Sequence, residues 1–199
     1  MSIGCLVGEL NYHSFMSSSL EKVIAEISDA IQKTQLDGYS DFLSAIENNG
    51  SKIVCTGAGR VGLAMRGFTM RLNHLGIDAH FLGETIVPHT GPGDLLIVGS
   101  GSGSTASILR LVEIAKSKGL KIALVTSTKT SPMRDLSDAS VFLHTPNKSS
   151  QSSELVSIQP MTTLFEQSLS IFLDSVVLDL MEKFGETSAS MWARHNVIE

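Results

Sequence analysis

The chain has 199 residues, of which 42% are hydrophobic and 18% are charged, and its formal net charge is −5. This composition is typical of one globular domain with a sizeable core, and it excludes disordered and fibrous proteins. Acidic and basic residues are interspersed, so the sequence offers no basic surface for a nucleic acid or an anionic membrane. Cys5 and Cys55 fit neither a disulfide framework nor a zinc site, and Cys55 is expected to be a buried strand residue.

The N-terminal segment does not resemble a secretory signal, because it lacks a basic region and its apolar run is interrupted by Gly4, Gly8 and Glu9. No stretch approaches the roughly 20 uninterrupted apolar residues of a membrane helix. We therefore expect a cytoplasmic protein that binds neither a nucleic acid nor a membrane.

Two helices are predicted before the first strand. Apolar residues recur at helical spacing from residue 17 to residue 49, and Gly38 interrupts this region. After Gly50, short apolar runs alternate with helical patterns. The predicted strands span residues 52–56, 78–82, 94–98, 121–125 and 140–144, and the helices between them span residues 61–75, 105–118 and 132–136.

Strands that alternate with helices predict βαβ units and a parallel sheet covered on both faces. We expect an α/β fold: a single doubly wound domain with a five-stranded parallel sheet flanked by helices, in the three-layer arrangement of flavodoxin. The domain spans residues 1–199, with the N-terminal helices of residues 1–49 packing on the core and a tail at 186–199. A serine-rich loop at 147–153 precedes a long helix over 160–184, in which Pro160 suits the first position.

Two glycine-rich loops follow predicted strands, at the edge of a parallel sheet where ligands bind. The first loop contains Gly57, Gly59 and Arg60, and the second consists of Ser100, Gly101, Ser102, Gly103, Ser104 and Thr105. Glycines permit close approach of the backbone, and the helix that follows presents free N–H groups to an anion. The four hydroxyls of the second loop can donate to a phosphate without adding charge. A helix cap would explain Ser104 or Thr105 singly, but the loop as a whole favours phosphate.

The first loop also matches the dinucleotide-binding pattern G-x-G-x-x-G over residues 57–62. Two helices precede the strand, Glu84 comes too late to be the expected ribose ligand, and no room remains for a substrate domain. A phosphosugar is therefore the better interpretation. The P-loop pattern and the G-x-S-x-G nucleophile pattern are absent, and the six histidines lack metal-binding spacing, so no metal site is predicted.

Several short segments resemble the 6-phospho-3-hexuloisomerases, which are members of the sugar-isomerase (SIS) domain superfamily. These segments are residues 57–60, 70–76, 83–85, 100–103, 160–166 and 194–195. The sequence Pro-Met-Thr-Thr-Leu-Phe-Glu at 160–166 and the terminal Arg194-His195 are the more specific ones. The resemblance runs from about residue 15 to the C-terminus.

The resemblance implies an enzyme that interconverts D-arabino-3-hexulose 6-phosphate and D-fructose 6-phosphate without a metal or an organic cofactor, in the ribulose monophosphate route of formaldehyde metabolism. It also implies a homotetramer. Glu166 is then the base that moves a proton through a cis-enediolate, a reaction for which one carboxylate suffices. His195 is implied as a second group that transfers a proton between substrate oxygens near neutral pH, in a neighbouring subunit's site. Arg60 is expected to contact the phosphate or the sugar hydroxyls.

Three features depart from the family pattern. Val61 stands where serine is usual, His89 stands where a small residue is common, and the asparagine of the tail comes one place early. These departures leave open an isomerase of another phosphosugar, such as a pentose or heptose phosphate, or a non-catalytic sugar-phosphate sensor. If the family motifs are disregarded, Glu166 would be interpreted as a solvated helix residue and His195 as part of an exposed tail. His74 is expected to be a structural histidine.

Overall fold

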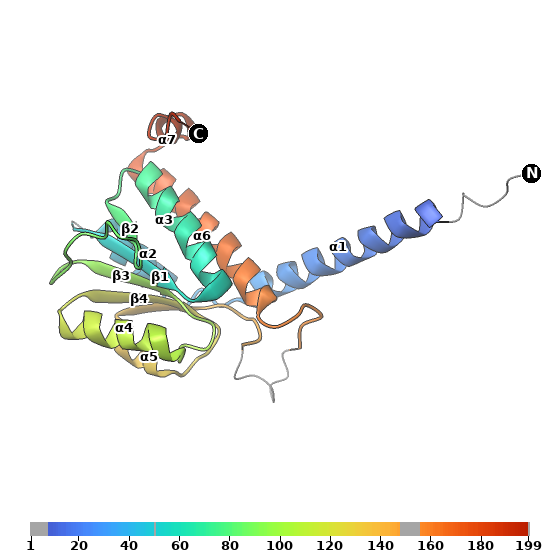
Figure 1. The fold of residues 1–199 in the computed structure, drawn as a ribbon, viewed down its shortest axis with the longest axis horizontal. Helices are drawn as coiled ribbons and strands as arrows, with labels where there is room; N and C mark the ends of the chain where they lie inside the picture. Colours follow the sequence, from blue (N-terminus) through green and yellow to red (C-terminus); the bar gives the residue numbers. More distant parts are fainter. Residues whose placement is uncertain (1–7, 50, 148–155, 199) are drawn as a thin grey trace, which may run out of the picture.

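The computed structural model describes the backbone of residues 8–49, 51–147 and 156–198, and the side chains from Ser18 onward. Five strands form one parallel sheet in the order β2-β1-β3-β4-β5 (Figure 1). The strands are β1 (Ile53–Gly57), β2 (Ala79–Phe81), β3 (Leu95–Gly99), β4 (Lys121–Thr126) and β5 (Ala139–Phe142). The predicted α/β fold with a five-stranded parallel sheet is confirmed.

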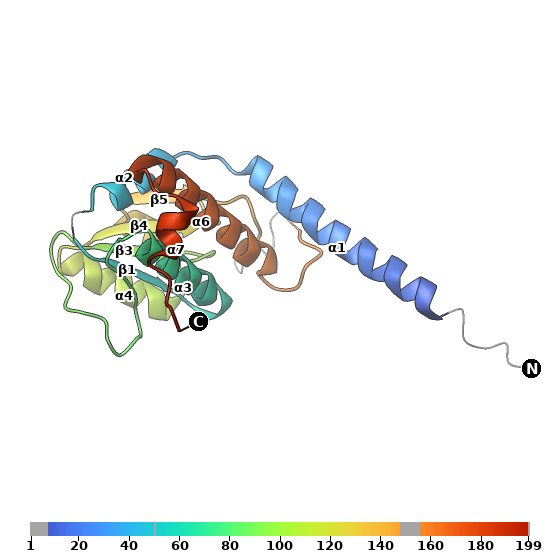
Figure 2. The ribbon, with the colours of Figure 1, turned by 90° about the horizontal axis from the view of Figure 1, so that it is seen from above.

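Helices cover both faces of the sheet (Figures 1 and 2). One face carries α2 (Tyr39–Glu47), α3 (Gly59–His74) and α6 (Thr163–Phe184), and the other carries α4 (Ala106–Ser117) and α5 (Pro132–Leu136). In strand β1, Ile53 and Cys55 belong to the first core and Val54 to the second, since successive strand side chains point to opposite faces. Burial on both faces explains why the strands are visible in the sequence as apolar runs.

The start of the long helix differs from the prediction. The helix was expected to begin at Pro160, but α6 begins at Thr163. Met161 has a φ of 59°, in the left-handed region, so a right-handed helix cannot pass through it. Instead, the backbone N–H and the hydroxyl of Thr163 donate to the Pro160 carbonyl oxygen at 3.3 and 2.7 Å. The predicted loop at 147–153 lies mostly outside the described residues.

The two N-terminal helices behave differently from each other. Helix α2 packs on the core through three buried apolar side chains. Helix α1 (Gly8–Lys33) instead projects from the body in both views, and its Leu20 and Ile24 are 61% and 57% exposed (Figures 1 and 2). Among its described side chains, Ala30 near the C-terminal end is buried, and just after the helix the hydroxyl of Thr34 accepts a hydrogen bond from the His144 N–H at 3.1 Å.

The end of the chain forms a separate small element. Gly185 ends α6 with a φ of 65°, a left-handed conformation typical of glycine after a helix. The short tail helix α7 (Ser188–Trp192) follows and begins with a capping box at Thr187.

Within the described part of the chain, no helix combines the length and the apolar composition needed to cross a membrane.

Cys55 lies in the middle of β1 and is fully buried, as predicted from the sequence. Burial raises the pKa of its thiol to about 12. The thiol therefore stays protonated near neutral pH and is a packing group rather than a nucleophile.

Two glycines of α3 allow a matched test of how closely this helix packs on the sheet. A Cβ at Gly62 would lie 2.6 Å from the Gly57 carbonyl oxygen, whereas a Cβ at Gly67 would meet nothing within 4 Å. We expect Gly62→Ala to lower the free energy of unfolding by about 1–3 kcal/mol through overpacking. Gly67→Ala should raise it by about 0.5–1 kcal/mol through helix propensity. Urea unfolding followed by circular dichroism measures both, and equal effects of the two substitutions would contradict the proposed close packing.

Candidate active site

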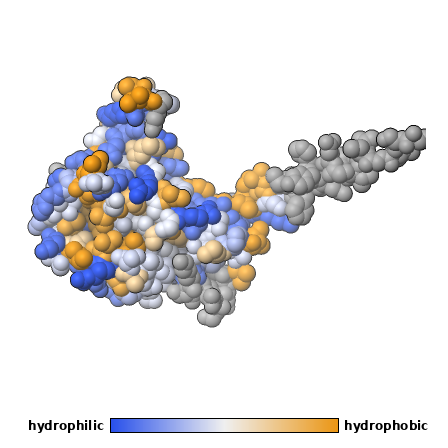
Figure 3. All heavy atoms as spheres, viewed as in Figure 1, coloured by the Kyte–Doolittle hydropathy of each residue, from blue (hydrophilic) through white to orange (hydrophobic). Residues whose placement is uncertain are grey.

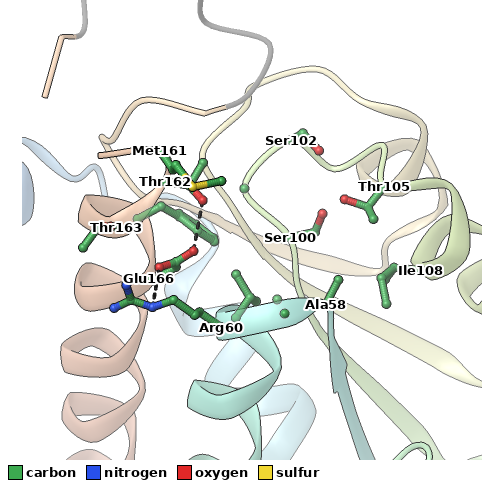
Figure 4. Close-up of a pocket in the computed structure, with 15 residues that line it drawn as sticks. Ala58, Arg60, Ser100, Ser102, Thr105, Ile108, Met161, Thr162, Thr163 and Glu166 are labelled. Atoms are coloured by element: carbon green, nitrogen blue, oxygen red, sulfur yellow. Dashed lines mark hydrogen bonds and ion pairs between the residues drawn. The ribbon is translucent and has the colours of Figure 1, made fainter. Parts of the chain in front are cut away.

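Three helix N-termini meet at one cavity beyond the carboxyl ends of the strands. The cavity has a volume of about 280 Å³, and its lining includes the first residues of α3 and α6 and the N-cap residue of α4 (Figure 4). A helix N-terminus carries partial positive charge and free N–H groups, so this arrangement favours an anionic ligand. The volume lies just below the usual range for ligand pockets, roughly 300–1,000 Å³, so the cavity suits a small ligand.

The structure brings most of the predicted site residues together. The predicted residues that line the cavity are Gly59, Arg60, Ser100, Gly101, Ser102, Thr105 and Glu166. Gly57, Gly103 and Ser104 belong to the same loops but are not part of the lining, and His195 lies elsewhere.

The serine-glycine loop is held rigidly against the end of β4. The Gly101 carbonyl oxygen accepts hydrogen bonds from the Ser127 N–H at 3.1 Å, the Ser127 hydroxyl at 3.0 Å and the Thr126 hydroxyl at 3.1 Å. Gly103 has a φ of 59°, and a Cβ there would lie 2.1 Å from the Ser131 hydroxyl oxygen. The backbone of the loop is therefore fixed before any ligand binds.

Thr105 occupies the N-cap position of α4, but its side chain makes no capping hydrogen bond. Ser131 shows the contrast, because its hydroxyl caps α5 by accepting from the Arg134 N–H at 3.2 Å. The hydroxyl of Thr105 is thus not used as a cap, and Thr105 lines the cavity with Ser100 and Ser102 (Figure 4).

Glu166 lies in the first turn of α6, because the helix begins later than expected. Its side chain is only 13% exposed, and its Oε1 accepts a hydrogen bond from the Thr162 hydroxyl at 3.0 Å. Its Oε2 is buried and lies 3.0 Å from Nε of Arg60, without an aligned hydrogen bond (Figure 4). Arg60 therefore faces Glu166 as a counter-charge, a contact that the sequence did not predict.

Sequence reasoning also missed the apolar part of the site. Phe165 packs beneath the serine-glycine loop, since a Cβ on Gly101 would lie 3.2 Å from its ring. Val61 fills the space beside two strand-end glycines: its Cγ1 would lie 2.9 Å from a Cβ on Gly57 and 2.8 Å from one on Gly99. Both β1 and β3 end in glycine, and this is the signal in the sequence that could have been used. A glycine at a strand end leaves room for a side chain from a neighbouring helix, here Val61.

His195 lies far from Glu166 within this chain. Its ring centroid is 5.3 Å from that of His74 and 4.9 Å from that of Trp192. His74 ends α3, a helix of 16 residues whose other end opens on the cavity, so about 24 Å of helix separates the two places at 1.5 Å per residue. His74 itself is buried, and its Nδ1 lies 3.2 Å from Arg71 Nη1.

Arg194 fixes the tail next to His195. Its guanidinium donates to the His74 carbonyl oxygen at 2.9 Å and to both carboxylate oxygens of Glu186 at 2.9 and 2.8 Å. The hydrogen bond from Arg194 is the main cause that lowers the pKa of Glu186 to about 2. The position of His195 is therefore set by a two-pronged ion pair.

Among the described residues, no group of three or more His, Cys, Asp or Glu side chains is placed to hold a metal ion. The polar side chains that line the cavity are hydroxyls, one guanidinium and one carboxylate.

A family model described as the SIS domain matches residues 48–172 of the chain. The chain belongs to the SIS domain family. This SIS domain protein is 40% identical to a 3-hexulose-6-phosphate isomerase of Bacillus subtilis over 148 residues. The matched region covers 74% of this chain and 80% of that protein. It is 34% identical to a 3-hexulose-6-phosphate isomerase of Methylomonas aminofaciens over 92% of this chain and all of that protein.

Solved structures agree with the SIS fold. A crystal structure of a hypothetical protein superposes with a TM-score of 0.82 at 31% identity, over 92% of this chain and 97% of the other. A Methanococcus jannaschii protein, for which a 3-hexulose-6-phosphate isomerase function was inferred from its structure, superposes with a TM-score of 0.76 at 30% identity, over 92% and 99%. The resemblance of the sequence to this family is thereby confirmed.

Two alanine substitutions test whether Thr105 acts as a helix cap. We expect Ser131→Ala to lower the free energy of unfolding by about 1 kcal/mol, because a working cap is lost. Thr105→Ala should change it by less than about 0.5 kcal/mol, as surface substitutions do. Urea unfolding of both variants decides the question. Equal losses would show that the Thr105 hydroxyl supports the helix instead of facing a ligand.

Proposed function

We propose that the protein is a 6-phospho-3-hexuloisomerase, which interconverts D-arabino-3-hexulose 6-phosphate and D-fructose 6-phosphate. One observation carries this proposal: the serine-glycine loop and the carboxylate of Glu166 line the same small cavity, although they lie about 60 residues apart in the chain. The similarity to proteins named 3-hexulose-6-phosphate isomerase supports the choice of substrate.

In this proposal the serine-glycine loop holds the phosphate. The hydroxyls of Ser100, Ser102 and Thr105 donate to phosphate oxygens, and the N-terminus of α4 adds its partial positive charge. The loop itself contains no lysine or arginine, so the phosphate is bound by neutral donors and can be released after the reaction. Val61 lines the cavity with methyl groups, and its side chain cannot donate a hydrogen bond to the phosphate. In this proposal the hydroxyl donors therefore come from the serine-glycine loop next to α4.

Glu166 is the proposed base. Its carboxylate takes the proton from C2 of the 3-hexulose phosphate, which leaves a cis-enediolate across C2 and C3, and then returns the proton to C3. A proton leaves the oxygen on C2 while another reaches the oxygen on C3, so the carbonyl moves from C3 to C2 and no electrons leave the substrate. Thr162 holds one oxygen of the carboxylate, and Arg60 balances the charge of the other.

His195 is proposed to serve the site of a neighbouring subunit in a cytoplasmic homotetramer. The length of α3 separates it from the cavity of its own chain. Helix α1 projects with exposed apolar side chains, and apolar atoms gather over α7 and where α1 leaves the body (Figure 3). Exposed apolar surface of this kind is typical of contacts between subunits.

Glu166→Gln is the decisive variant, because it keeps the size and polarity of the side chain but removes its basicity. We expect turnover to fall by about 10²–10⁴-fold, the usual contribution of a general base. Binding of fructose 6-phosphate, followed by thermal stabilisation, should remain. Glu182→Gln, an exposed change on the same helix, is the matched control and should keep full activity.

Formation of fructose 6-phosphate from the 3-hexulose phosphate measures the effect. Turnover of Glu166→Gln at the wild-type rate would refute the assignment of the base. Preference of the wild-type protein for a pentose or heptose phosphate in a panel of ketose phosphates would favour the alternative isomerase. Stabilisation by phosphosugars without any turnover would favour a sensor.

Mixing two inactive variants tests the shared site. Glu166→Gln subunits retain His195, and His195→Ala subunits retain Glu166. If each site combines the two residues from different subunits, random mixing restores activity in about a quarter of the sites. If both residues act within one chain, the mixture stays as inactive as the separate variants. Initial rates before and after exchange of subunits, with self-mixed variants as controls, distinguish the two outcomes.

A further inference from the structure

The segment before α6, residues 157–162, ends at the edge of the cavity, and we call it the strap. Met161 and Thr162 line the cavity (Figure 4), and the residue Met161 is 88% exposed. Met161 also has a left-handed φ of 59°, which residues other than glycine rarely adopt. Such conformations persist only where the surrounding structure holds them, so the strap must be fixed on both sides.

Two sets of hydrogen bonds fix the strap. On its C-terminal side, Thr163 holds the carbonyl of Pro160 through its N–H and its hydroxyl. On its N-terminal side, the carboxylate of Glu26 accepts from the Ile158 N–H at 2.8 Å with Oε1 and from Nε2 of Gln159 at 2.9 Å with Oε2. Hydrogen bonds to a carboxylate are stronger than those between neutral groups. Both carboxylate oxygens of Glu26 thus bind the strap.

Glu26 belongs to α1, more than 130 residues before the strap. It lies four residues before Ala30, one turn from the buried anchor of the helix, and is itself half-buried. The strap leads directly to Thr162, whose hydroxyl donates to Oε1 of Glu166. A continuous set of contacts therefore joins α1 to the carboxylate in the cavity.

On the basis of the proposed role of Glu166, we infer that Glu26 is a positioning residue for the reaction. It holds the strap so that Met161 keeps its left-handed backbone and Thr162 keeps the carboxylate of Glu166 in place. Without Glu26, the strap loses the hydrogen bonds on its N-terminal side, so Met161 and Thr162 are held from the side of Thr163 alone. The phosphate end of the site is unaffected, because the serine-glycine loop is held by β4.

Kinetics of Glu26→Ala test the effect on the reaction. We expect kcat to fall about tenfold, since a misplacement of about 1 Å can cost roughly a hundredfold and Thr163 still holds the other side of the strap. KM should change by less than about threefold, because the phosphate contacts remain. Glu26→Gln keeps an oxygen for the Ile158 N–H and should restore most of the activity. Asp29→Ala removes a carboxylate of the same helix whose partner among the described residues is the exposed Lys33, and it should match the wild type.

Hydrogen exchange of the peptide covering residues 156–162 gives a readout that does not depend on activity. Glu26→Ala should speed exchange in this peptide about tenfold, and Asp29→Ala should not. Gln159→Ala removes only the side-chain contact and should change kcat and exchange in the same direction by less. It also decides the matter if Glu26→Ala fails to fold.

Unchanged exchange in Glu26→Ala, or an equal change in Asp29→Ala, would overturn the inference. Faster exchange with an unchanged kcat would overturn it as well, because the strap would then be held without positioning the base. If the wild-type protein converts no ketose phosphate, the proposed function fails, and the exchange data still decide whether Glu26 holds the strap.

Discussion

The arrangement of the site depends on two glycines at the ends of neighbouring strands. Gly57 of β1 and Gly99 of β3 pair in register, and neither carries a Cβ. Val61 fills the space beside both, and Leu169 of α6 would lie 3.2 Å from a Cβ on Gly99. Because α3 and α6 can lie this close to the sheet, their N-termini open on one cavity. Any larger side chain at either glycine would push these helices away from it.

The two ends of the cavity carry different chemistry. The serine-glycine loop offers neutral donors and the positive end of a helix, which suit a phosphate. The other end carries the carboxylate of Glu166 beside Arg60. A phosphate and a carboxylate repel each other, and the repulsion is stronger in a poorly solvated cavity. In the proposed function, the distance between the loop and Glu166 and the positive charge of Arg60 would reduce this repulsion within a cavity of about 280 Å³.

Helix α1 and the tail with α7 extend from the body of the domain in different directions (Figure 1). Helix α1 projects from one side, and the tail with α7 lies at the far end of α3 (Figure 1). Both are held by specific polar contacts, through Glu26 and Thr34 for α1 and through Arg194 for the tail. These contacts fix the orientation of each element relative to the body of the domain. In the proposed tetramer, the same elements would meet other subunits.

The sequence by itself determined the fold class and placed the serine-glycine loop at the edge of the sheet where the cavity lies. Strands buried on both faces must be apolar runs, so they were found to within two residues, and the rule for parallel sheets placed the serine-glycine loop at the ligand edge. Motif resemblance singled out Glu166 but not its surroundings. Only the tertiary structure decided the start of α6, the ion pair with Arg60, the contacts of Glu26 and the separation of His195 from Glu166. Local preference places Pro160 at a helix start, but Met161 has a left-handed backbone, and the segment before it is held by Glu26, a residue distant in sequence that local patterns do not reveal.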